Sequence, residues 1–355
     1  MSGTLQPRKI LVMRFSAMGD VAMTVPVLLA LQRDYPDVEV VMLSRKRFEP
    51  LFNQLKNVNF VEARLSDRHK GIVGLYRLAK QLKTMDIDAV VDLHNVLRTK
   101  VLRNFMSKIP SSKLDKGRAD KKKLVSDPAF FEPLKHTTQR YADAFTDLGF
   151  SIKLEHNEFL STLTLPDEVN SSVNTDGYVL IGFSPFAAHK TKALTVNKAK
   201  RITQQLARIP NAQVVLIGGG EKEARKLQLV AATTPHVINL AGTTSFENEL
   251  AIISNLDVMI AMDSGNGHLA AIYGVPTITL WGNTHPYAGF APYAQPRDNQ
   301  LTANRKKYPL LPTSIFGDKK VEGYRKVTNS IKTKRLIQRL EEVLNLPLSS
   351  KTDYN

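Results

Sequence analysis

The chain has 355 residues, of which 43% are hydrophobic, and Lys plus Arg exceed Asp plus Glu by 49 to 33, a formal charge of +16. This length favours two domains, and the absence of cysteine excludes disulfides, thiolate metal sites and cysteine nucleophiles. Because no apolar signal core or bilayer-spanning run is present, we expect a cytoplasmic protein. The positive charge favours an anionic partner (nucleic acid, a phosphorylated substrate or an acidic membrane face), although it also suits a surface kept basic for solubility.

Apolar segments alternate with segments of helical period along the first half of the chain, which is typical of a parallel sheet covered by helices. Strands are expected at residues 10–15, 38–43, 58–61 and 89–93. Helices are expected at residues 21–35, 48–55, 71–83, 96–106 and 137–148. Residues 113–123 (KLDKGRADKKK) are basic and poor in apolar residues, so we expect a loop there.

A polar stretch at residues 166–177 is typical of a linker, and the alternation restarts after it. Strands are expected at 178–183, 213–217, 237–240, 258–261 and 277–281, and helices at 196–208, 221–231, 246–254, 267–273 and 331–344. We therefore expect an N-terminal domain (1–165), a linker (166–177), a C-terminal domain (178–330) and a helix with a tail (331–355). That last helix is expected to pack back toward the N-terminal domain. Two such halves predict a ligand cleft between the carboxyl ends of their sheets.

The stretch RFSAMGDVAMTVP, residues 14–26, follows the first strand and leads through Gly19 into a helix-like segment. It resembles a phosphate-binding turn but lacks the three glycines of a dinucleotide fingerprint and contains an acid, Asp20. Asp20 is a candidate base that accepts a proton from an incoming hydroxyl. The alternative is that Asp20 is only the N-cap of the following helix.

Two stretches of the second half are candidate anion sites. Small residues and free amide groups gather between Asp263 and His268 (DSGNGH), at a predicted strand-to-helix turn. The alternative there is an ordinary turn capped by Asp263 or Ser264. Residues 184–192 follow the first strand of this half, and their Lys190 and Lys192 are suited to neutralise a diphosphate; the alternative is a solvated basic loop.

The glycine triplet at residues 218–220 is a weaker signal, in which Gly219 allows close approach of a ligand and Glu221 is suited to hold a ribose or a base edge. No metal site is expected, because the eight histidines show no metal-ligand spacing and the carboxylates do not cluster. Asp20 and Asp263 are the only acids at predicted cleft turns. This favours one base acting on a hydroxyl over the acid and base pair of a hydrolase.

Four segments together resemble glycosyltransferase family 9, the bacterial ADP-heptose:lipopolysaccharide heptosyltransferases. They are KILVMRFSAMGDVAMTVPVLLALQRDYP, VVDLHNVLRTKVL, VVLIGGGEKE and MDSGNGHLAAIYGVPTITLWGNTHP, and the resemblance extends over nearly the whole chain. It implies a GT-B architecture, with two Rossmann-like α/β domains whose parallel sheets face a central cleft. The acceptor side is N-terminal and the nucleotide-sugar side is C-terminal. It also implies an inverting reaction that does not depend on a bound metal.

The resemblance implies roles for single residues. Asp20 would be the general base, Lys192 the cation that neutralises the diphosphate, and Asp263, Ser264, Gly265 and His268 the donor-binding loop. Other candidates are Ser184, Lys190, Gly219 and Glu221 on the donor side, and Met18, Gly19, His94, Asn95, Lys121 and Lys122 on the acceptor side. Two features depart from the family pattern: Leu194 and Thr195 replace a tryptophan–proline pair, which makes Lys190 a rival of Lys192, and Gly267 adds a glycine to the loop.

We therefore expect transfer of a heptose from ADP-heptose to a lipopolysaccharide inner-core acceptor, with no cofactor and no required metal. The expected partners are the nucleotide sugar and an anionic lipid-linked saccharide, with the basic residues 113–123 contacting the acceptor and no nucleic acid bound. Peripheral contact with the inner membrane fits such an acceptor. One alternative is a GT-B transferase or epimerase that uses another nucleotide sugar. Another is a basic, non-enzymatic protein that binds membranes or nucleic acid, which would not need the glycine–acid turns present in both halves.

Overall fold

The computed structural model describes residues 6–170, 173, 177–232 and 234–346. The chain forms two compact units. Unit 1 comprises Met1–Lys116 and His136–Phe159, and unit 2 comprises Gly117–Lys135 and Leu160–Asn355. Residues 117–135 and 160–165, which were expected in the N-terminal domain, therefore belong to unit 2.

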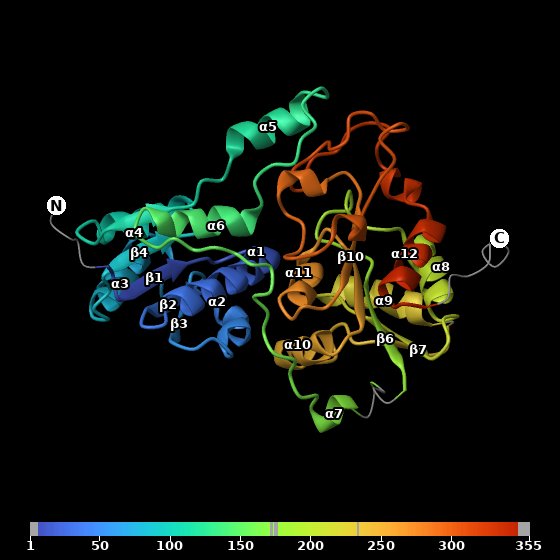
Figure 1. Cartoon of the computed structure of the whole chain (residues 1–355), viewed down its shortest axis with the longest axis horizontal. Coiled ribbons are helices and arrows are strands. Elements are labelled where there is room, and N and C mark those ends of the chain that lie inside the picture. The colour runs from blue at the N-terminus through green and yellow to red at the C-terminus, as the bar shows by residue number, and fades with distance from the viewer. Residues whose placement is uncertain (1–5, 171–172, 174–176, 233, 347–355) are drawn as a thin grey trace. The chain divides into compact units, whose positions relative to one another are not determined.

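Unit 1 contains a parallel sheet in the order β3-β2-β1-β4-β5, as the alternation of strands and helices predicted. Its strands are β1 (Lys9–Met13), β2 (Glu39–Ser44), β3 (Val58–Glu62), β4 (Ala89–Asp92) and β5 (Ser111–Lys113). Its helices are α1 (Met18–Ala22), α2 (Thr24–Asp34), α3 (Gly71–Lys83), α4 (Leu97–Phe105) and α6 (Thr137–Thr146), with the 3₁₀ helix η1 (Lys46–Phe52). Figure 1 draws them in blue to green, a range that also includes the teal helix of residues 118–126, which belongs to unit 2.

The central position of β1 decides where its following residues lie. Met13 pairs with Leu43 of β2 on one side and with Asp92 of β4 on the other. In a parallel sheet, the segments that follow neighbouring strands emerge at the same edge. The turn after β1 and the turn after β4 are therefore neighbours within unit 1.

Two predicted helices of unit 1 have a different form. The helix expected at 21–35 is divided into α1 and α2, because Pro26 has no amide hydrogen for the carbonyl of Ala22, where α1 ends. The helix expected at 48–55 is η1, which contains Pro50.

Unit 2 contains a second parallel sheet, in the order β11-β10-β9-β6-β7-β8. Its strands are β6 (Val179–Ser184), β7 (Ala212–Leu216), β8 (Val237–Asn239), β9 (Val258–Met262), β10 (Thr277–Trp281) and β11 (Gln300–Thr302). Its helices are α5 (Arg118–Ser126), α7 (Asp167–Asn170), α8 (Val196–Leu206), α9 (Glu221–Ala231), α10 (Phe246–Ser254), α11 (Gly265–Ala271) and α12 (Thr333–Val343). The 3₁₀ helices are η2 (Pro286–Ala288), η3 (Arg297–Asn299) and η4 (Val327–Ser330). The two α/β sheets confirm the predicted fold class.

Residues 113–123 are not the loop that their composition predicted. Lys113 ends β5, and Arg118 begins α5 directly after Gly117, whose φ of 56° is in the left-handed region. Leu124 is buried, and the ammonium of Lys121 lies over the ring of Phe290, 4.1 Å from its centroid. The helix is thus stabilised by contacts with residues far along the chain. The expected linker at 166–177 includes α7, and residues 171–172 and 174–176 of it lie outside the described residues.

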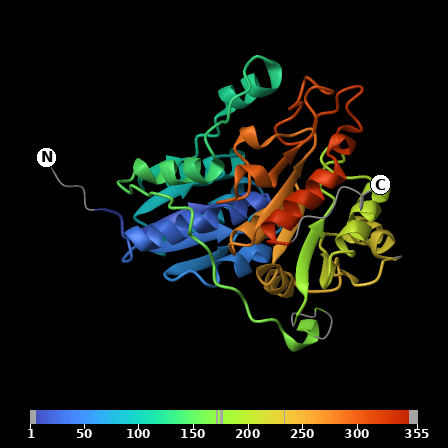
Figure 2. The same ribbon diagram turned by 45° about the vertical axis from the view of Figure 1, so that its right-hand side comes forward.

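Helix α12 packs within unit 2, whereas we expected it to pack toward the N-terminal domain. Leu336, Ile337 and Leu340 are buried in the same core cluster as residues of α8, and α12 lies beside α8 in Figure 1. The ammonium of Lys198 on α8 donates hydrogen bonds to the carbonyls of Thr328 (2.7 Å) and Ile331 (2.6 Å). These bonds hold the segment that leads into α12, which is the red helix in Figure 2.

Candidate active site

Asp20 is the third residue of α1, whose N-cap is Ala17. Its Oδ2 lies 2.5 Å from Nη2 of Arg14 and accepts a hydrogen bond from the amide of Ala17 at 3.1 Å. The carboxylate therefore reaches back to the helix start but is not the N-cap, which was the alternative to a functional role. Its side chain keeps 25% of its surface exposed, so a ligand can reach it.

Arg14, which follows β1, is held in place by several contacts within unit 1. Its side chain is 8% exposed, and Nη1 donates to the carbonyl of Leu93 at 2.7 Å. The guanidinium also lies 5.7 Å from the ring centroid of Tyr141, and the Tyr141 hydroxyl donates to the carbonyl of Asp20 at 3.3 Å. Burial raises the pKa of Tyr141, which therefore stays protonated and able to donate. Arg14 and Tyr141 were not predicted as site residues, although an arginine at the end of a central strand was a usable signal.

His94 and Asn95 lie in the turn after β4, beside the turn after β1. Their amides donate to Oδ1 of Asp92, at 3.0 Å and 2.7 Å, and Asn95 has a left-handed φ of 46°. The amide of Phe15 points to Nδ1 of His94 at 3.4 Å. Burial, followed by the positive charge of Arg14, lowers the pKa of His94 to about 3. His94 is therefore neutral at physiological pH, so it can exchange hydrogen bonds with a ligand but brings no charge.

The predicted acceptor-side residues are divided between the units. Gly19 is buried and Met18 is half-buried on α1, so both accompany Asp20 in unit 1, as do His94 and Asn95. Lys121 and Lys122 belong to α5 of unit 2. Lys122 is exposed, but Lys121 is only 9% exposed and contacts the Phe290 ring. Lys121 therefore packs within unit 2, whereas its basic segment was expected to contact the acceptor from the surface.

In unit 2, the two oppositely charged candidates form one cluster. Nζ of Lys192 lies 3.2 Å from Oδ2 of Asp263, and the two side chains are 14% and 10% exposed. The hydroxyl of Thr284 donates to the same carboxylate oxygen at 2.8 Å. Lys190, the rival of Lys192 in the sequence, is exposed. Thr284 was not singled out, although it lies in the last stretch that carried the resemblance.

Gly317 fixes the position of Lys192. Its φ is +80°, and a Cβ added there would lie 2.4 Å from Cγ and 2.6 Å from Cδ of Lys192. The hydroxyl of Thr191 donates to the carbonyl of Gly317, which holds the two segments together. Only a glycine lets the backbone approach the lysine stem this closely.

The loop after Asp263 contains a buried hydroxyl whose hydrogen bond is not made by the described residues. Ser264 is the N-cap of α11, and its Oγ is buried without a hydrogen-bond partner among the described residues. An unmade hydrogen bond of this kind costs ~1–3 kcal/mol, which a ligand can recover. Gly267 is explained by packing, because a Cβ there would lie 3.3 Å from the Cβ of Ala261 on β9.

The remaining donor-side candidates differ in their surroundings. Gly265 begins α11, and His268 is 6% exposed on the same helix. Ser184 ends β6 and accepts a hydrogen bond from Nδ2 of Asn266 at 2.8 Å, so its role in this structure is to hold the loop. Gly219 donates its amide to Glu223 at 3.0 Å and has open space beside it. Glu221 is exposed and pairs with Arg225 at 3.2 Å, so it points to solvent.

The described residues contain neither a cluster of metal-ligating side chains nor a helix that could span a membrane. Across the described ranges, no group of three or more His, Asp or Glu side chains is placed to hold a metal ion. In the same part of the chain, no helix has the length and apolarity needed to cross a bilayer.

Comparisons with known proteins now identify the family. The family model of glycosyltransferase family 9 (heptosyltransferase) matches residues 75–320. The lipopolysaccharide core heptosyltransferase OpsX of Haemophilus influenzae is 24% identical, over 82% of this chain and 83% of that protein. Among solved structures, a family 9 glycosyltransferase from Veillonella parvula aligns with a TM-score of 0.74 at 19% identity, covering 95% of this chain and 97% of that one. Heptosyltransferase WaaC of E. coli with ADP aligns with a TM-score of 0.67 at 17% identity, covering 94% and 99%. These structures share the fold, and the matched family model shows that this chain is a glycosyltransferase that belongs to family 9.

Proposed function

We propose that this enzyme transfers a heptose from ADP-heptose to a sugar of a lipopolysaccharide inner core, with inversion at the anomeric carbon. The names of its relatives support the sugar and the acceptor, and the ADP of the WaaC structure supports the nucleotide. The observation that carries the proposal is the ion pair of the nearly buried Lys192 with Asp263, which precedes Ser264, whose hydroxyl has no partner among the described residues.

In this proposal, unit 2 binds the donor through that cluster. The ammonium of Lys192 faces the diphosphate, and Asp263 with Thr284 keeps the ammonium in position. The Ser264 hydroxyl and the amides after it complete the contacts to phosphate oxygens. As the bond from the anomeric carbon to the diphosphate breaks, negative charge grows on ADP, and Lys192 stabilises it. This cation supplies charge that a divalent metal would otherwise provide, so we propose that no metal is required.

Unit 1 supplies the base. The acceptor hydroxyl attacks the anomeric carbon from the face opposite to ADP, and its proton passes to the carboxylate of Asp20. Arg14 and the amide of Ala17 orient that carboxylate, and their contacts leave its second oxygen for the acceptor. Neutral His94, whose pKa lies far below physiological pH, adds a hydrogen-bonding partner without a competing positive charge.

The alternatives differ from this proposal in the nucleotide that they bind or in what they do to the donor sugar when no acceptor is present. We expect a thermal-shift panel of ADP, UDP, GDP and CMP to give a selective rise in melting temperature with ADP. A selective response to UDP would overturn the heptose donor and favour another nucleotide sugar. An absence of any nucleotide response, together with binding that falls steeply with salt, would favour the basic non-enzymatic alternative. An epimerase would convert or release the donor sugar when no acceptor is present, whereas we expect the donor to stay intact.

We also propose that a surface of unit 1 contacts the membrane that carries the acceptor. On α3, Ile72, Val73 and Tyr76 are 69%, 65% and 56% exposed, and Arg77 and Lys80 on the same helix are also exposed. Apolar side chains among cations are suited to the interface of an anionic bilayer. Ile72→Ser should weaken co-sedimentation with vesicles of phosphatidylcholine and phosphatidylglycerol. Leu229→Ser, which alters an equally apolar residue that is 54% exposed on α9, should not. Equal sedimentation of both variants with wild type would refute this surface.

A further inference from the structure

Unit 2 contains a large groove that the proposed reaction does not use. The groove has a volume of about 890 Å³ and follows the edge strand β11, between η2 and the start of α12. Five of its lining residues are cations and only Asp298 is an acid; the cations are Arg297, Arg305, Lys306, Lys332 and Arg335. It shares no lining residue with the cluster of Lys192 and Asp263. One of its lining residues, His285, directly follows Thr284, the hydrogen-bond partner of Asp263.

The charges of this groove are not balanced within the described part of the chain. None of the five cations forms an ion pair with a described residue. Arg305 is the most enclosed of them: its guanidinium lies 3.4 Å from the ring centroid of Phe131, and its Nε is buried without a hydrogen-bond partner. Like charges gathered in one concave surface repel one another, so an anion that enters is stabilised by several of them at once.

The pKa of His285 reflects both its burial and the positive charge of the groove. Burial lowers its pKa to about 3, and the charges of Arg305 and Arg297 act in the same direction. Its Nδ1 accepts a hydrogen bond from the amide of Tyr287 at 3.2 Å, which fixes the ring. His285 therefore lines the groove as a neutral side chain, and the charged hydrogen-bond donors that line the groove are the five cations.

Aromatic rings lie among these cations and are also fixed. The ring centroid of Phe131 is 4.8 Å from that of His285 and 4.6 Å from that of Tyr287. Arg297 donates to the Tyr287 hydroxyl at 2.8 Å. Ring faces that alternate with guanidinium groups match a ligand with apolar C–H faces and anionic groups, as in a phosphorylated sugar.

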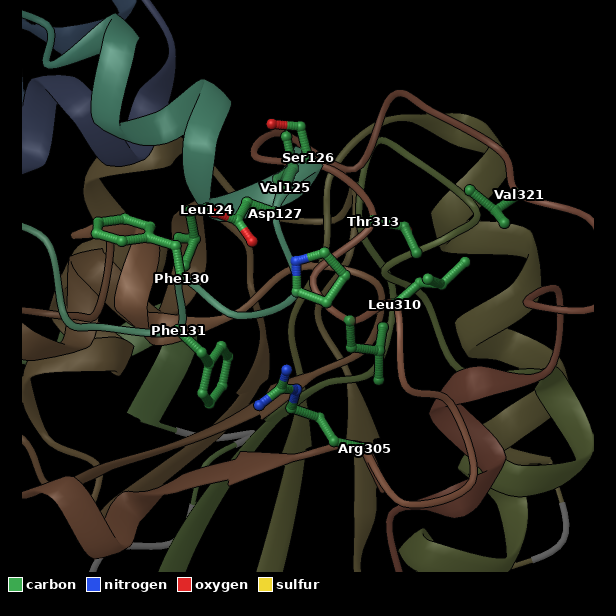
Figure 3. A pocket seen from close by; sticks show the side chains of 12 residues that line it. Leu124, Val125, Ser126, Asp127, Phe130, Phe131, Arg305, Leu310, Thr313 and Val321 are labelled. Atoms are coloured by element: carbon green, nitrogen blue, oxygen red, sulfur yellow. The ribbon is translucent and has the colours of Figure 1, made fainter.

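Figure 3 shows the Arg305 guanidinium beside the Phe131 ring at the edge of a second, smaller pocket. This pocket has a volume of about 140 Å³ and is lined by apolar side chains such as Leu124 and Leu310, together with the polar residues Ser126, Asp127 and Thr313. Arg305 and Phe131 line both cavities.

We propose that this groove binds a saccharide that carries two or more phosphate or carboxylate groups. The choice of a saccharide over a nucleic acid rests on the proposed function, since a glycosyltransferase encounters charged glycans as acceptors or products. The site is separate from the donor cluster. The groove would therefore hold an anionic glycan on unit 2 whether or not a nucleotide occupies the donor cluster.

Fructose 1,6-bisphosphate is a suitable probe, titrated by calorimetry into the full-length protein with ADP present to fill the donor cluster. The only tryptophan of the chain, Trp281, gives a second readout, because its indole N–H donates at 2.9 Å to Gln300, which lines the groove. We expect saturable binding with a change in tryptophan fluorescence. Lys332→Gln with Arg335→Gln should weaken it at least ~10-fold, since two charge-assisted contacts are lost.

Matched variants make this test specific. Arg201→Gln with Arg208→Gln removes one exposed cation on α8 and another just after it, and should leave the affinity unchanged. Arg305→Gln should weaken binding as strongly as the double variant, because it removes the enclosed cation.

Three outcomes would overturn the proposal: equal affinity of the groove and control variants, inorganic phosphate binding as tightly as the sugar bisphosphate, or a single-stranded oligonucleotide displacing it with higher affinity. Loss of the ADP response with intact bisphosphate binding would contradict the proposed donor and leave the groove supported. The reverse result would refute the groove alone.

Discussion

Asp20→Asn is expected to reduce heptose transfer ~10²–10⁴-fold, the contribution typical of a positioned general base. The amide oxygen of asparagine can still accept from the Ala17 amide, so the start of α1 should survive. What is lost is the carboxylate that takes the proton of the acceptor hydroxyl. Single-turnover transfer with saturating donor measures this loss directly. ADP binding, which we assign to unit 2, should remain at its wild-type affinity.

The variant also breaks the pair with Arg14, so its stability needs a control. Arg14 keeps the carbonyl of Leu93 as an acceptor, and we expect a loss of only ~1–2 kcal/mol in the free energy of unfolding. Asp88→Asn is the matched control, because Oδ2 of Asp88 accepts from the amides of Arg8 and Lys9 at the other end of β1. It should cost similar stability and leave transfer intact. Near-normal turnover of Asp20→Asn would return Asp20 to a structural role.

The fold was predictable where the sequence signal is local. The predicted bounds of α3, α9, α10 and β10 agree with the structure residue for residue. In each of these elements, apolar residues recur with one period, and a glycine, serine or proline borders the segment. Strands of a parallel sheet are continuous apolar runs, so the division into two α/β halves was also visible.

The sequence did not reveal elements that depend on distant contacts. Helix α5 has few apolar residues of its own and is completed by the contact of Lys121 with Phe290. Strand β11 has only three residues, which is too short for a periodic pattern, and is defined by its pairing with β10. The site has the same limit. Asp20 and Asp263 could be named as candidates from their turns, and the end of a central strand was a signal for Arg14, but Thr284 became visible only through its hydrogen bond to Asp263 in the folded chain.

Lys192→Gln is the second variant for which we expect a large effect, a loss of ADP affinity of ~10–100-fold. Charge-assisted contacts to phosphate are about twice as strong as neutral ones, and the ammonium is nearly buried, where water screens it weakly. Lys190→Gln is the matched control, since that side chain is exposed, and it should bind ADP like wild type. Equal losses in the two variants would contradict the assignment of the diphosphate to Lys192.

A second ligand separates a role in phosphate binding from a structural role. If Lys192 only neutralises Asp263, Lys192→Gln should weaken the binding of adenosine and of ADP alike, because the whole loop would shift. If it faces the diphosphate, adenosine should bind both proteins equally and only ADP should discriminate between them. Calorimetric titration of the two ligands gives this comparison without any acceptor.

Gly317→Ala tests the same lysine without changing its chemistry. The added Cβ would lie 2.4 Å from the Lys192 stem, so the ammonium must move, and we expect the ADP-specific loss seen for Lys192→Gln. Alanine at a left-handed φ also costs ~1–2 kcal/mol, wherever it is placed. Gly323→Ala isolates that cost, because Gly323 has a φ of +77° and nothing within 4 Å of the added Cβ. A Gly317→Ala protein that binds ADP as well as Gly323→Ala does would show that the contact with Gly317 does not position Lys192 for the donor.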